Sequence, residues 1–193
     1  MKIALFGGAF DPPHIGHKVV ADSLIQNKIV DEVWFVPVFK HPWADRYGKQ
    51  QLTDYDARVK MLNLTAESIK NSKKIKVEHF KEVSFTYDTL KYFSERLPQH
   101  EFCWVMGSEY LDRFDDFLKG HPRLIDFTFY IYPRAGYQLN ESLRKPNMIF
   151  LTDMPEVTAS STEIRKLIKE KQPVKKLLLS SVLKFIQENN LYF

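Results

Sequence analysis

The feature that most constrains the fold of this chain is a regular alternation of short apolar runs with longer segments of helical periodicity. The expected strands are rich in β-branched and aromatic residues and cover positions 3–6, 33–38, 75–80, 102–106, 127–132 and 148–151. The expected helices cover positions 15–29, 56–69, 86–97, 109–118, 160–170 and 177–187. This alternation predicts an α/β fold, a doubly wound parallel sheet with helices on both faces.

Ligands of such sheets bind at the carboxyl ends of the strands, so the segments that follow the strands are candidate functional segments. The chain of 193 residues fits one domain, 1–193. We expect its last ~30 residues to form a helical C-terminal extension. Residues 40–55 have no clear period and predict a long loop, and long loops in compact domains often carry function.

The charge and the chain start exclude several classes of protein. A formal charge of +4 suits an anionic substrate but is too small to indicate a nucleic-acid partner. The first apolar run stops at Gly7, too early for a signal sequence or a membrane span. We therefore expect a cytoplasmic protein with no membrane partner. The single cysteine, Cys103, lies in an apolar run and predicts a buried, inert thiol.

The first chemically informative segment is GGAFDPPHIGH at positions 7–17, between the first strand and the first helix. Gly7 and Gly8 allow the backbone to approach a ligand closely. A spacing of three residues puts His14 and His17 on one face of the first helical turn, beside its free N–H groups. Two imidazoles at a helix N-terminus predict a phosphate site.

Three alternatives compete for this segment. Zinc ligation by the two histidines lacks further ligands, because the chain has a single cysteine and no nearby second pair; we predict no metal held by protein ligands. A proline-containing turn does not need two histidines at this spacing. A dinucleotide fingerprint would need G-x-G-x-x-G, which is absent.

The second segment, ASSTEIR at positions 159–165, places three hydroxyl side chains at an expected helix start and Arg165 one turn later. Hydroxyls, free N–H groups and a guanidinium can together hold phosphate oxygens. Alone, the segment is better explained by a capping box between Ser160 and Glu163 with an exposed arginine, which needs no ligand. The first segment favours the phosphate interpretation.

These two segments resemble the H-x-G-H and I-S-S-T-x-I-R motifs of the nucleotidyltransferase superfamily, which also includes the class I aminoacyl-tRNA synthetases. Ala159 stands where the second motif usually has isoleucine. Gly107-Ser108-Glu109 is similar to the G-[AS]-D-x-L segment of that superfamily, with Glu109 in place of aspartate. Across nearly the whole chain, the resemblance is greatest to the nicotinate and nicotinamide mononucleotide adenylyltransferases. It implies a Rossmann-like fold.

The resemblance also implies an activity: joining nicotinate or nicotinamide mononucleotide to the AMP moiety of ATP, with release of pyrophosphate, in NAD biosynthesis. It implies Mg²⁺, bound mainly through the ATP phosphates, as cofactor. Other members with the first motif, the phosphopantetheine adenylyltransferases and the cytidylyltransferases, stay open as alternatives. So do a non-enzymatic nucleotide-binding regulatory module and the formation of a homo-oligomer.

The same resemblance assigns roles to individual residues. Catalysis is expected from His14, His17 and Arg165. Contacts with ATP are expected from Gly7, Gly8, Ala9, Phe10, His14, His17, Gly107, Ser108, Glu109, Ser160, Ser161, Thr162 and Arg165. Contacts with the pyridine mononucleotide are expected from His41, Lys49, Arg58, Thr86 and Phe117.

Overall fold

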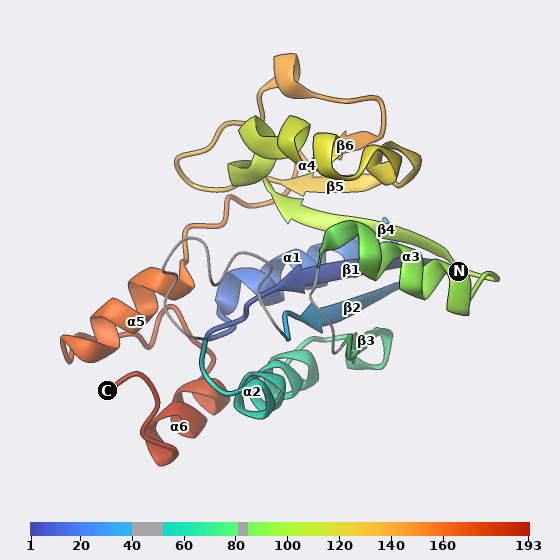
Figure 1. Ribbon diagram of the computed structural model, residues 1–193. Helices are drawn as coiled ribbons and strands as arrows, with labels where there is room; N and C mark the ends of the chain where they lie inside the picture. The colour runs from blue at the N-terminus through green and yellow to red at the C-terminus, as the bar shows by residue number, and fades with distance from the viewer. Residues whose placement is uncertain (40–51, 81–84) are drawn as a thin grey trace.

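A computed structural model gives the structure of the chain and describes residues 1–39, 52–80 and 85–193 (Figure 1). Within these residues, six strands form one sheet with the order β3-β2-β1-β4-β5-β6. Every neighbouring pair is parallel. The strands are β1 (Lys2–Gly8), β2 (Glu32–Pro37), β3 (Ile75–Val77), β4 (Glu101–Gly107), β5 (Phe129–Tyr132) and β6 (Met148–Phe150).

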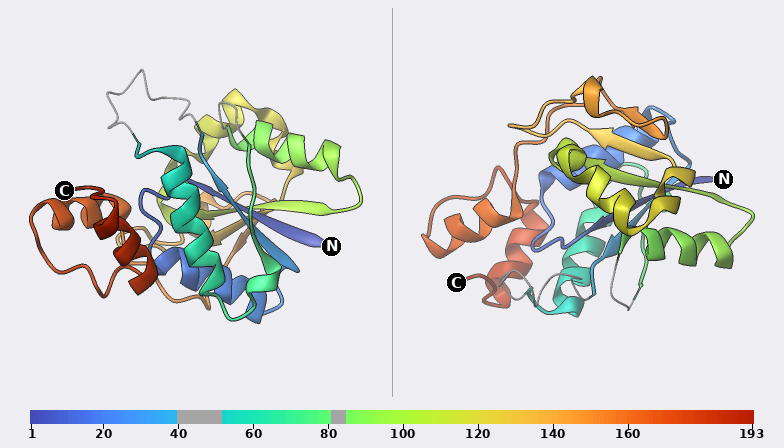
Figure 2. Two further views of the ribbon diagram at one scale, coloured as in Figure 1. Left: turned by 90° about the horizontal axis from the view of Figure 1, so that it is seen from below. Right: turned by 45° about the horizontal axis from the view of Figure 1, so that its top comes forward.

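Helices cover both faces of this sheet (Figures 1 and 2). The helices are α1 (Ile15–Gln26), α2 (Tyr55–Glu67), α3 (Thr86–Arg96), α4 (Phe114–Gly120), α5 (Ser161–Lys169) and α6 (Ser180–Glu188). Helices α1 and α2 share a core with one set of alternating strand residues, including Phe6 and Phe35. Helices α3 and α4 pack with the opposite set, including Leu5 and Trp34. The predicted doubly wound, Rossmann-like α/β fold is therefore confirmed.

The C-terminal helices form a third cluster beside α2 rather than covering the sheet. Met61 of α2 packs with Ile164 of α5 and with Val182 and Ile186 of α6. The second ribbon view shows α5 and α6 next to α2 (Figure 2). Within the described ranges, no helix is long and apolar enough to cross a membrane.

Several expected boundaries were wrong: α1 ends at Gln26 rather than at 29, and β5 starts at Phe129 rather than at 127. Three further boundaries differ as follows. Strand β3 was expected to reach position 80 but ends at Val77, the last of its residues that is paired with β2. The amide of Glu78 donates one more hydrogen bond, to Phe35 O. The segment after β4 begins as a 3₁₀ helix, η2 (Ser108–Arg113), before α4 starts at Phe114. Helix α6 starts at Ser180, because Leu177 and Leu178 both donate to Val174 O in a separate turn.

Short 3₁₀ helices connect the remaining elements: η1 (Ser72–Lys74), η3 (Pro122–Asp126) and η4 (Glu141–Leu143). The strand order reverses between β1 and β4, since the chain runs outward from β1 through β2 and β3 and then returns to the other side of β1. A reversal of this kind opens a crevice at the carboxyl ends of the two central strands. Here those ends are Gly8 and Gly107.

Candidate active site

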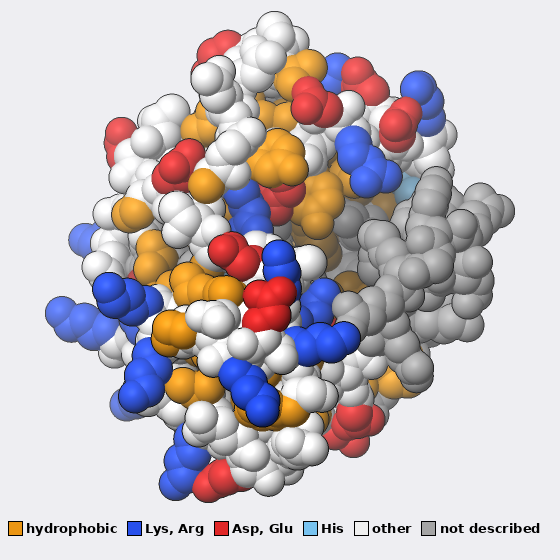
Figure 3. All heavy atoms as spheres, turned by 90° about the vertical axis from the view of Figure 1, so that its left-hand side faces the viewer, with side chains coloured by type: hydrophobic (Ala, Val, Ile, Leu, Met, Phe, Trp, Pro, Cys, Tyr) orange, Lys and Arg blue, Asp and Glu red, His pale blue; other side chains and the backbone are white. Residues whose placement is uncertain are grey.

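A cavity of about 610 Å³ lies at this reversal. It is lined by the ends of β1 and β4, the start of α1, the start of α5 and parts of α3 and α4. The volume is in the range of small-molecule sites, which are ~300–1,000 Å³. The face of the molecule at this end of the sheet is hollowed near its centre (Figure 3).

His14 and His17 lie in this cavity as a stacked pair, with ring centroids 3.8 Å apart and planes 27° apart. The backbone N–H of His14 donates to Nδ1 of His17 over 3.0 Å. The neutral His17 ring therefore carries its proton on Nε2. The edges of the Phe10 and Phe6 rings pack against His17, at centroid distances of 4.9 and 5.7 Å.

Burial lowers the pKa of His14 to about 3, and the charge of Arg134 adds to the effect. Burial, then His14, then Arg134 lower the pKa of His17 well below its usual value. Both rings are thus neutral at pH 7 and each supplies one N–H donor. His14 Nδ1 is buried at the start of α1, where the His14 side chain and the His17 backbone N–H form the second half of a reciprocal capping box. Nε2 is therefore the nitrogen that each ring has left for a ligand.

Gly16 lies between the two histidines, at a position where a larger side chain would not fit. A Cβ at position 16 would lie 2.4 Å from Cγ1 of Val157 and 3.1 Å from the His14 ring. Val157 belongs to the segment that leads into α5, so α1 and that segment approach closely at this point. Any larger residue would push α1 and the segment that leads into α5 apart.

The start of α5 faces the histidines, and two of its side chains donate hydrogen bonds to the loop between β1 and α1. Ser161 Oγ donates to Pro12 O over 2.9 Å, and Arg165 Nη1 donates to Asp11 O over 2.6 Å. Arg165 Nη2 also lies 3.5 Å from Thr162 Oγ1. In the part of the chain that the structure describes, Ser160 accepts no capping hydrogen bond from α5. The structure therefore does not form the capping box considered as the alternative.

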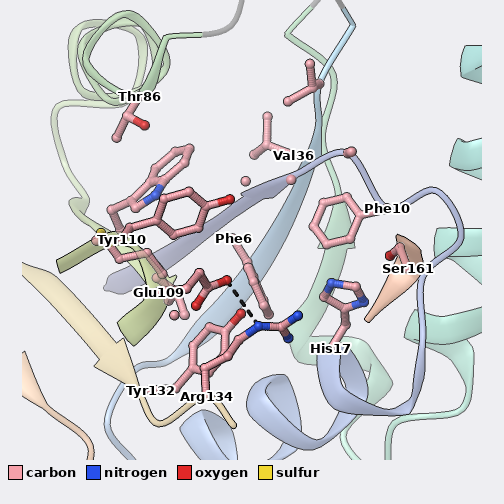
Figure 4. Close-up of a pocket in the computed structure, with 18 of the residues that line it drawn as sticks. Phe6, Phe10, His17, Val36, Thr86, Glu109, Tyr110, Tyr132, Arg134 and Ser161 are labelled. Atoms are coloured by element: carbon pink, nitrogen blue, oxygen red, sulfur yellow. Dashed lines mark ion pairs between the residues drawn. The ribbon is translucent and has the colours of Figure 1, made fainter. Parts of the chain in front are cut away.

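An ion pair forms one wall of the cavity: Arg134 Nε lies 3.2 Å from Glu109 Oε1 (Figure 4). A Cβ on Gly107 would approach Glu109 Oε2 to within 1.8 Å, so a larger residue there would displace this carboxylate. Burial raises the pKa of Glu109, against the lowering effects of its own backbone hydrogen bond and of Arg134. The Arg134 guanidinium extends from Glu109 toward His17 (Figure 4).

Arg134 was not among the sequence-predicted residues, although a signal for it exists. It follows β5 after a single proline, at the edge of the sheet where β1 and β4 also end. A cation directly after a buried strand at that edge is a candidate ligand residue. Arg134 Nη1 further donates to Ala159 O over 3.0 Å, which links it to the start of α5.

Aromatic side chains line the other end of the cavity. Phe117 and Thr86, both predicted, are present there, together with Trp104 and Tyr110, which were not predicted. Tyr132, also not predicted, lines the cavity on the histidine side, where it packs against Phe6. Tyr110 and Phe117 pack at a centroid distance of 6.3 Å. Figure 4 shows Thr86 and Tyr110 on the side of the cavity away from His17.

Most predicted ATP contacts converge on the cavity. The cavity is lined by Gly7, Gly8, Ala9, Phe10, His14, His17, Gly107, Glu109, Ser160, Ser161, Thr162 and Arg165. Ser108 is absent from that lining: its buried hydroxyl donates to Tyr137 O and accepts from the Arg134 amide.

Of the five residues predicted to contact the pyridine mononucleotide, Thr86 and Phe117 line the cavity. His41 and Lys49 lie outside the described residues. The side chain of Arg58 is 1% exposed and donates to the carbonyl oxygens of Thr53, Ala9 and Val38. Those bonds, at 2.8–2.9 Å, brace the loops around the cavity, and Arg58 does not line it.

The acidic and soft ligands of metal ions do not gather at the described part of the site. Across residues 1–39, 52–80 and 85–193, no group of three His, Cys, Asp or Glu side chains is placed to hold a metal. Cys103 is buried in β4 and donates to Ile3 O over 3.3 Å. Burial raises the pKa of its thiol to about 12.

Comparisons with known proteins agree with this geometry. The sequence profile of the cytidylyltransferase-like family matches residues 5–167. The nicotinate-nucleotide adenylyltransferase of Bacillus subtilis is 32% identical over 99% of this chain and 98% of its own length. A probable nicotinate-nucleotide adenylyltransferase of Flavobacterium johnsoniae is 32% identical over 100% of this chain and 99% of its own length.

The fold is shared with the nicotinic acid mononucleotide adenylyltransferase of Plasmodium falciparum in complex with NaAD. The TM-score is 0.82 at 23% sequence identity, covering 99% of this chain and 97% of that one. The same protein in complex with APC gives a TM-score of 0.83 at 22% identity, covering 99% and 96%. The chain therefore belongs to the cytidylyltransferase-like nucleotidyltransferases, in the family of the nicotinate-nucleotide adenylyltransferases.

Proposed function

We propose that this protein joins nicotinate mononucleotide to the AMP moiety of ATP and releases pyrophosphate, a step of NAD biosynthesis. The observation that carries the proposal is the meeting of two donor sets in one cavity. The stacked His14–His17 pair and the start of α5 both lie at the carboxyl ends of β1 and β4, although 144 to 151 residues separate them. The family and the relatives support the choice of substrates.

The reaction needs charge stabilisation more than proton transfer. The attacking atom is a phosphate oxygen of the mononucleotide, which is already ionised, so no general base is needed. That oxygen bonds to the α-phosphorus of ATP while the bond to the bridging oxygen breaks, and pyrophosphate leaves with the electron pair. Positioning and preorganised donors can supply the catalysis.

We assign His14 to the α-phosphate in the transition state and His17 to the α- or β-phosphate oxygens. Ser161, Thr162 and Arg165 hold the departing pyrophosphate. Three features support this assignment: the place of both histidines in the cavity lining, the proton on His17 Nε2, and the free N–H groups at the start of α5. A bound triphosphate would also raise the low pKa of both histidines, because its negative charge favours the protonated ring.

The aromatic end is assigned to the pyridine mononucleotide. Phe117, with Trp104 and Tyr110 beside it in the lining, offers flat apolar faces for a ring. The hydroxyl or backbone of Thr86 is available there for a polar contact. Glu109 and Arg134 lie between the two ends and are assigned to the nucleotide that bridges them.

Magnesium fits this site only through the ATP phosphates. The side chains around the phosphate end are imidazoles, hydroxyls and a guanidinium, whereas Mg²⁺ prefers oxygen ligands such as carboxylates, phosphates and water. Glu109, the carboxylate of the cavity lining, is already paired with Arg134. When bound on the triphosphate, the ion supplies neutralisation of its negative charge.

A substrate panel tests the proposal. The protein is mixed with MgATP and, separately, with nicotinate mononucleotide, nicotinamide mononucleotide or phosphopantetheine, and pyrophosphate release is measured. A parallel reaction pairs CTP with glycerol phosphate. We expect the highest kcat/KM with nicotinate mononucleotide. Preference for phosphopantetheine or for CTP would favour the other branches, and binding without turnover in every reaction would favour a regulatory module.

A further inference from the structure

The loop between β1 and α1 is held by side chains from distant parts of the chain. Three of its carbonyl oxygens accept hydrogen bonds: Ala9 O from Arg58, Asp11 O from Arg165, and Pro12 O from Ser161. These bonds are 2.6–2.9 Å long. The loop delivers His14, so its position decides where that ring meets a phosphate.

The carboxylate of Asp11 is the buried centre of this loop. It is 3% exposed, and its Oδ2 accepts the backbone N–H of Thr53 over 3.2 Å. Its Oδ1 accepts the hydroxyl of Tyr192 over 2.6 Å, from a residue 181 positions away. A buried carboxylate depends on such donors, because water cannot reach it to replace a hydrogen bond that is lost.

The chain turns back after α6 to bring Tyr192 to this place. Asn190 and Tyr192 have φ angles of 49° and 69°, in the left-handed region that non-glycine residues seldom adopt. The Leu191 amide donates to Ile186 O, which closes the turn. A backbone held in this conformation indicates that the contacts of Tyr192 outweigh its cost. Phe193, the next residue, is 62% exposed.

The tyrosine is a stable donor. Burial, and then the Asp11 carboxylate, raise the pKa of Tyr192 above its usual value, so the hydroxyl keeps its proton at neutral pH. The positive charge of Arg165 acts against this shift of the Tyr192 pKa. Burial lowers the pKa of Arg58, and Asp11 and Tyr192 in turn act against that lowering. Both arginines also donate hydrogen bonds to the loop between β1 and α1.

We propose that Tyr192 is a positioning residue for the phosphate end of the cavity: through Asp11 it fixes the loop that carries His14 and anchors Ser161 and Arg165. The proposal rests on the function assigned above to those three residues. It gives the segment after α6 a part in binding ATP, although Tyr192 is not among the residues that line the cavity.

The test compares Tyr192→Phe, which removes only the hydroxyl, with Phe193→Ala as the matched neighbour. Calorimetry measures the Kd for the α,β-methylene analogue of ATP, and thermal unfolding is recorded for each variant. We expect Tyr192→Phe to raise this Kd and to lower kcat/KM for ATP by about tenfold, as for other losses of positioning. The KM for nicotinate mononucleotide should change by less than about twofold, and Phe193→Ala should match the parent protein.

Asp11→Asn provides a second variant, in case Tyr192→Phe does not fold at the assay temperature. It keeps the shape of the side chain and removes its charge, and it should weaken analogue binding in the same way. The double variant should be no worse than Asp11→Asn alone, because the two residues act through one contact. Variants that unfold at a lower temperature but bind the analogue normally would overturn the proposal and leave Tyr192 as a purely stabilising residue.

The proposed function can fail separately. If the parent protein binds the analogue but releases no pyrophosphate with any mononucleotide, the assigned reaction is wrong, while the Kd values still test Tyr192. If the parent protein does not bind the analogue, both the function and the role of Tyr192 are refuted.

Discussion

The two ends of the cavity are built differently. The end that we assign to the ATP phosphates, the phosphate end, is lined by His14 and His17 at the start of α1 and by Ser161, Thr162 and Arg165 at the start of α5. Two short segments therefore supply its side-chain donors. The aromatic end takes single residues from α3, β4, η2 and α4. Phosphate recognition depends on backbone N–H groups at helix starts, which a short motif can fix. A ring needs only flat apolar faces at the right distance, which any element can offer.

This difference predicts where substitutions act. Changes at the phosphate end should lower kcat or the use of ATP, because its donors meet the group whose charge changes in the transition state. Changes at the aromatic end should mainly raise the KM for the mononucleotide, because ring contacts are the same in the ground and transition states.

The largest expected effect is that of His17→Ala. Losing one preorganised donor to a transition-state phosphate typically lowers kcat by ~10²–10³-fold. Steady-state kinetics with saturating substrates, together with circular dichroism to show that the fold is intact, provide the measurement. His100→Ala, at the opposite end of β4 from the cavity, is the control. Turnover of His17→Ala near that of the parent protein would refute its catalytic role.

Arg165→Ala should weaken the use of ATP more than the use of the mononucleotide. The guanidinium bonds to Asp11 O and Thr162 Oγ1 and lines the phosphate end. We expect kcat/KM for ATP to fall by ~10-fold or more, the value of one charge-assisted hydrogen bond. Lys166→Ala, an exposed neighbour on α5, is the matched control. An ATP dependence unchanged from that of Lys166→Ala would leave α5 with a structural role only.

Phe117→Ala sharpens the comparison from the aromatic end. Losing one stacking face should raise the KM for nicotinate mononucleotide by ~5- to 10-fold, since stacking of a base on an aromatic side chain is worth ~1–3 kcal/mol. The KM for ATP should stay within about twofold. Phe117→Trp should keep most of the affinity. An equal loss for both substrates would mean that the two ends are not separate.

Cys103→Ala should have the smallest effect. The thiol is buried outside both ends of the cavity, with a pKa raised to about 12, and the direct transfer of AMP needs no nucleophile. A loss of stability of ~1 kcal/mol is expected from the smaller side chain. Activity at a temperature where the variant is folded should equal that of the parent protein, and complete loss of turnover there would indicate a covalent enzyme.

The parts that sequence could predict are those with a local cause. Strand–helix alternation predicted the sheet, and the spacing of His14 and His17 predicted that both rings lie on one face of the first helical turn, where the structure stacks them. Arg134 was missed because its partners, Glu109 and Ala159, meet it only through the order of the strands. Tyr192 lies in the expected C-terminal extension and was assigned no role, because a contact across 181 positions leaves no pattern in the sequence.

Arg58 shows the opposite case, a residue assigned to the substrate that the structure places under the loops. Sequence gives its charge but not its burial, and three loop carbonyls occupy its guanidinium. Element boundaries were missed for a related reason. The 3₁₀ turns after β4 and after Val174 are selected by tertiary packing rather than by residue propensity.

The stereochemistry at the α-phosphorus tests the central claim most directly, namely that the phosphate end aligns a direct attack of the mononucleotide on ATP. The protein is supplied with nicotinate mononucleotide and ATP made chiral at the α-phosphate, and the configuration of the dinucleotide product is determined. The account predicts inversion, the result of a single in-line displacement. Retention would require two displacements through an enzyme-bound AMP, and it would contradict the account.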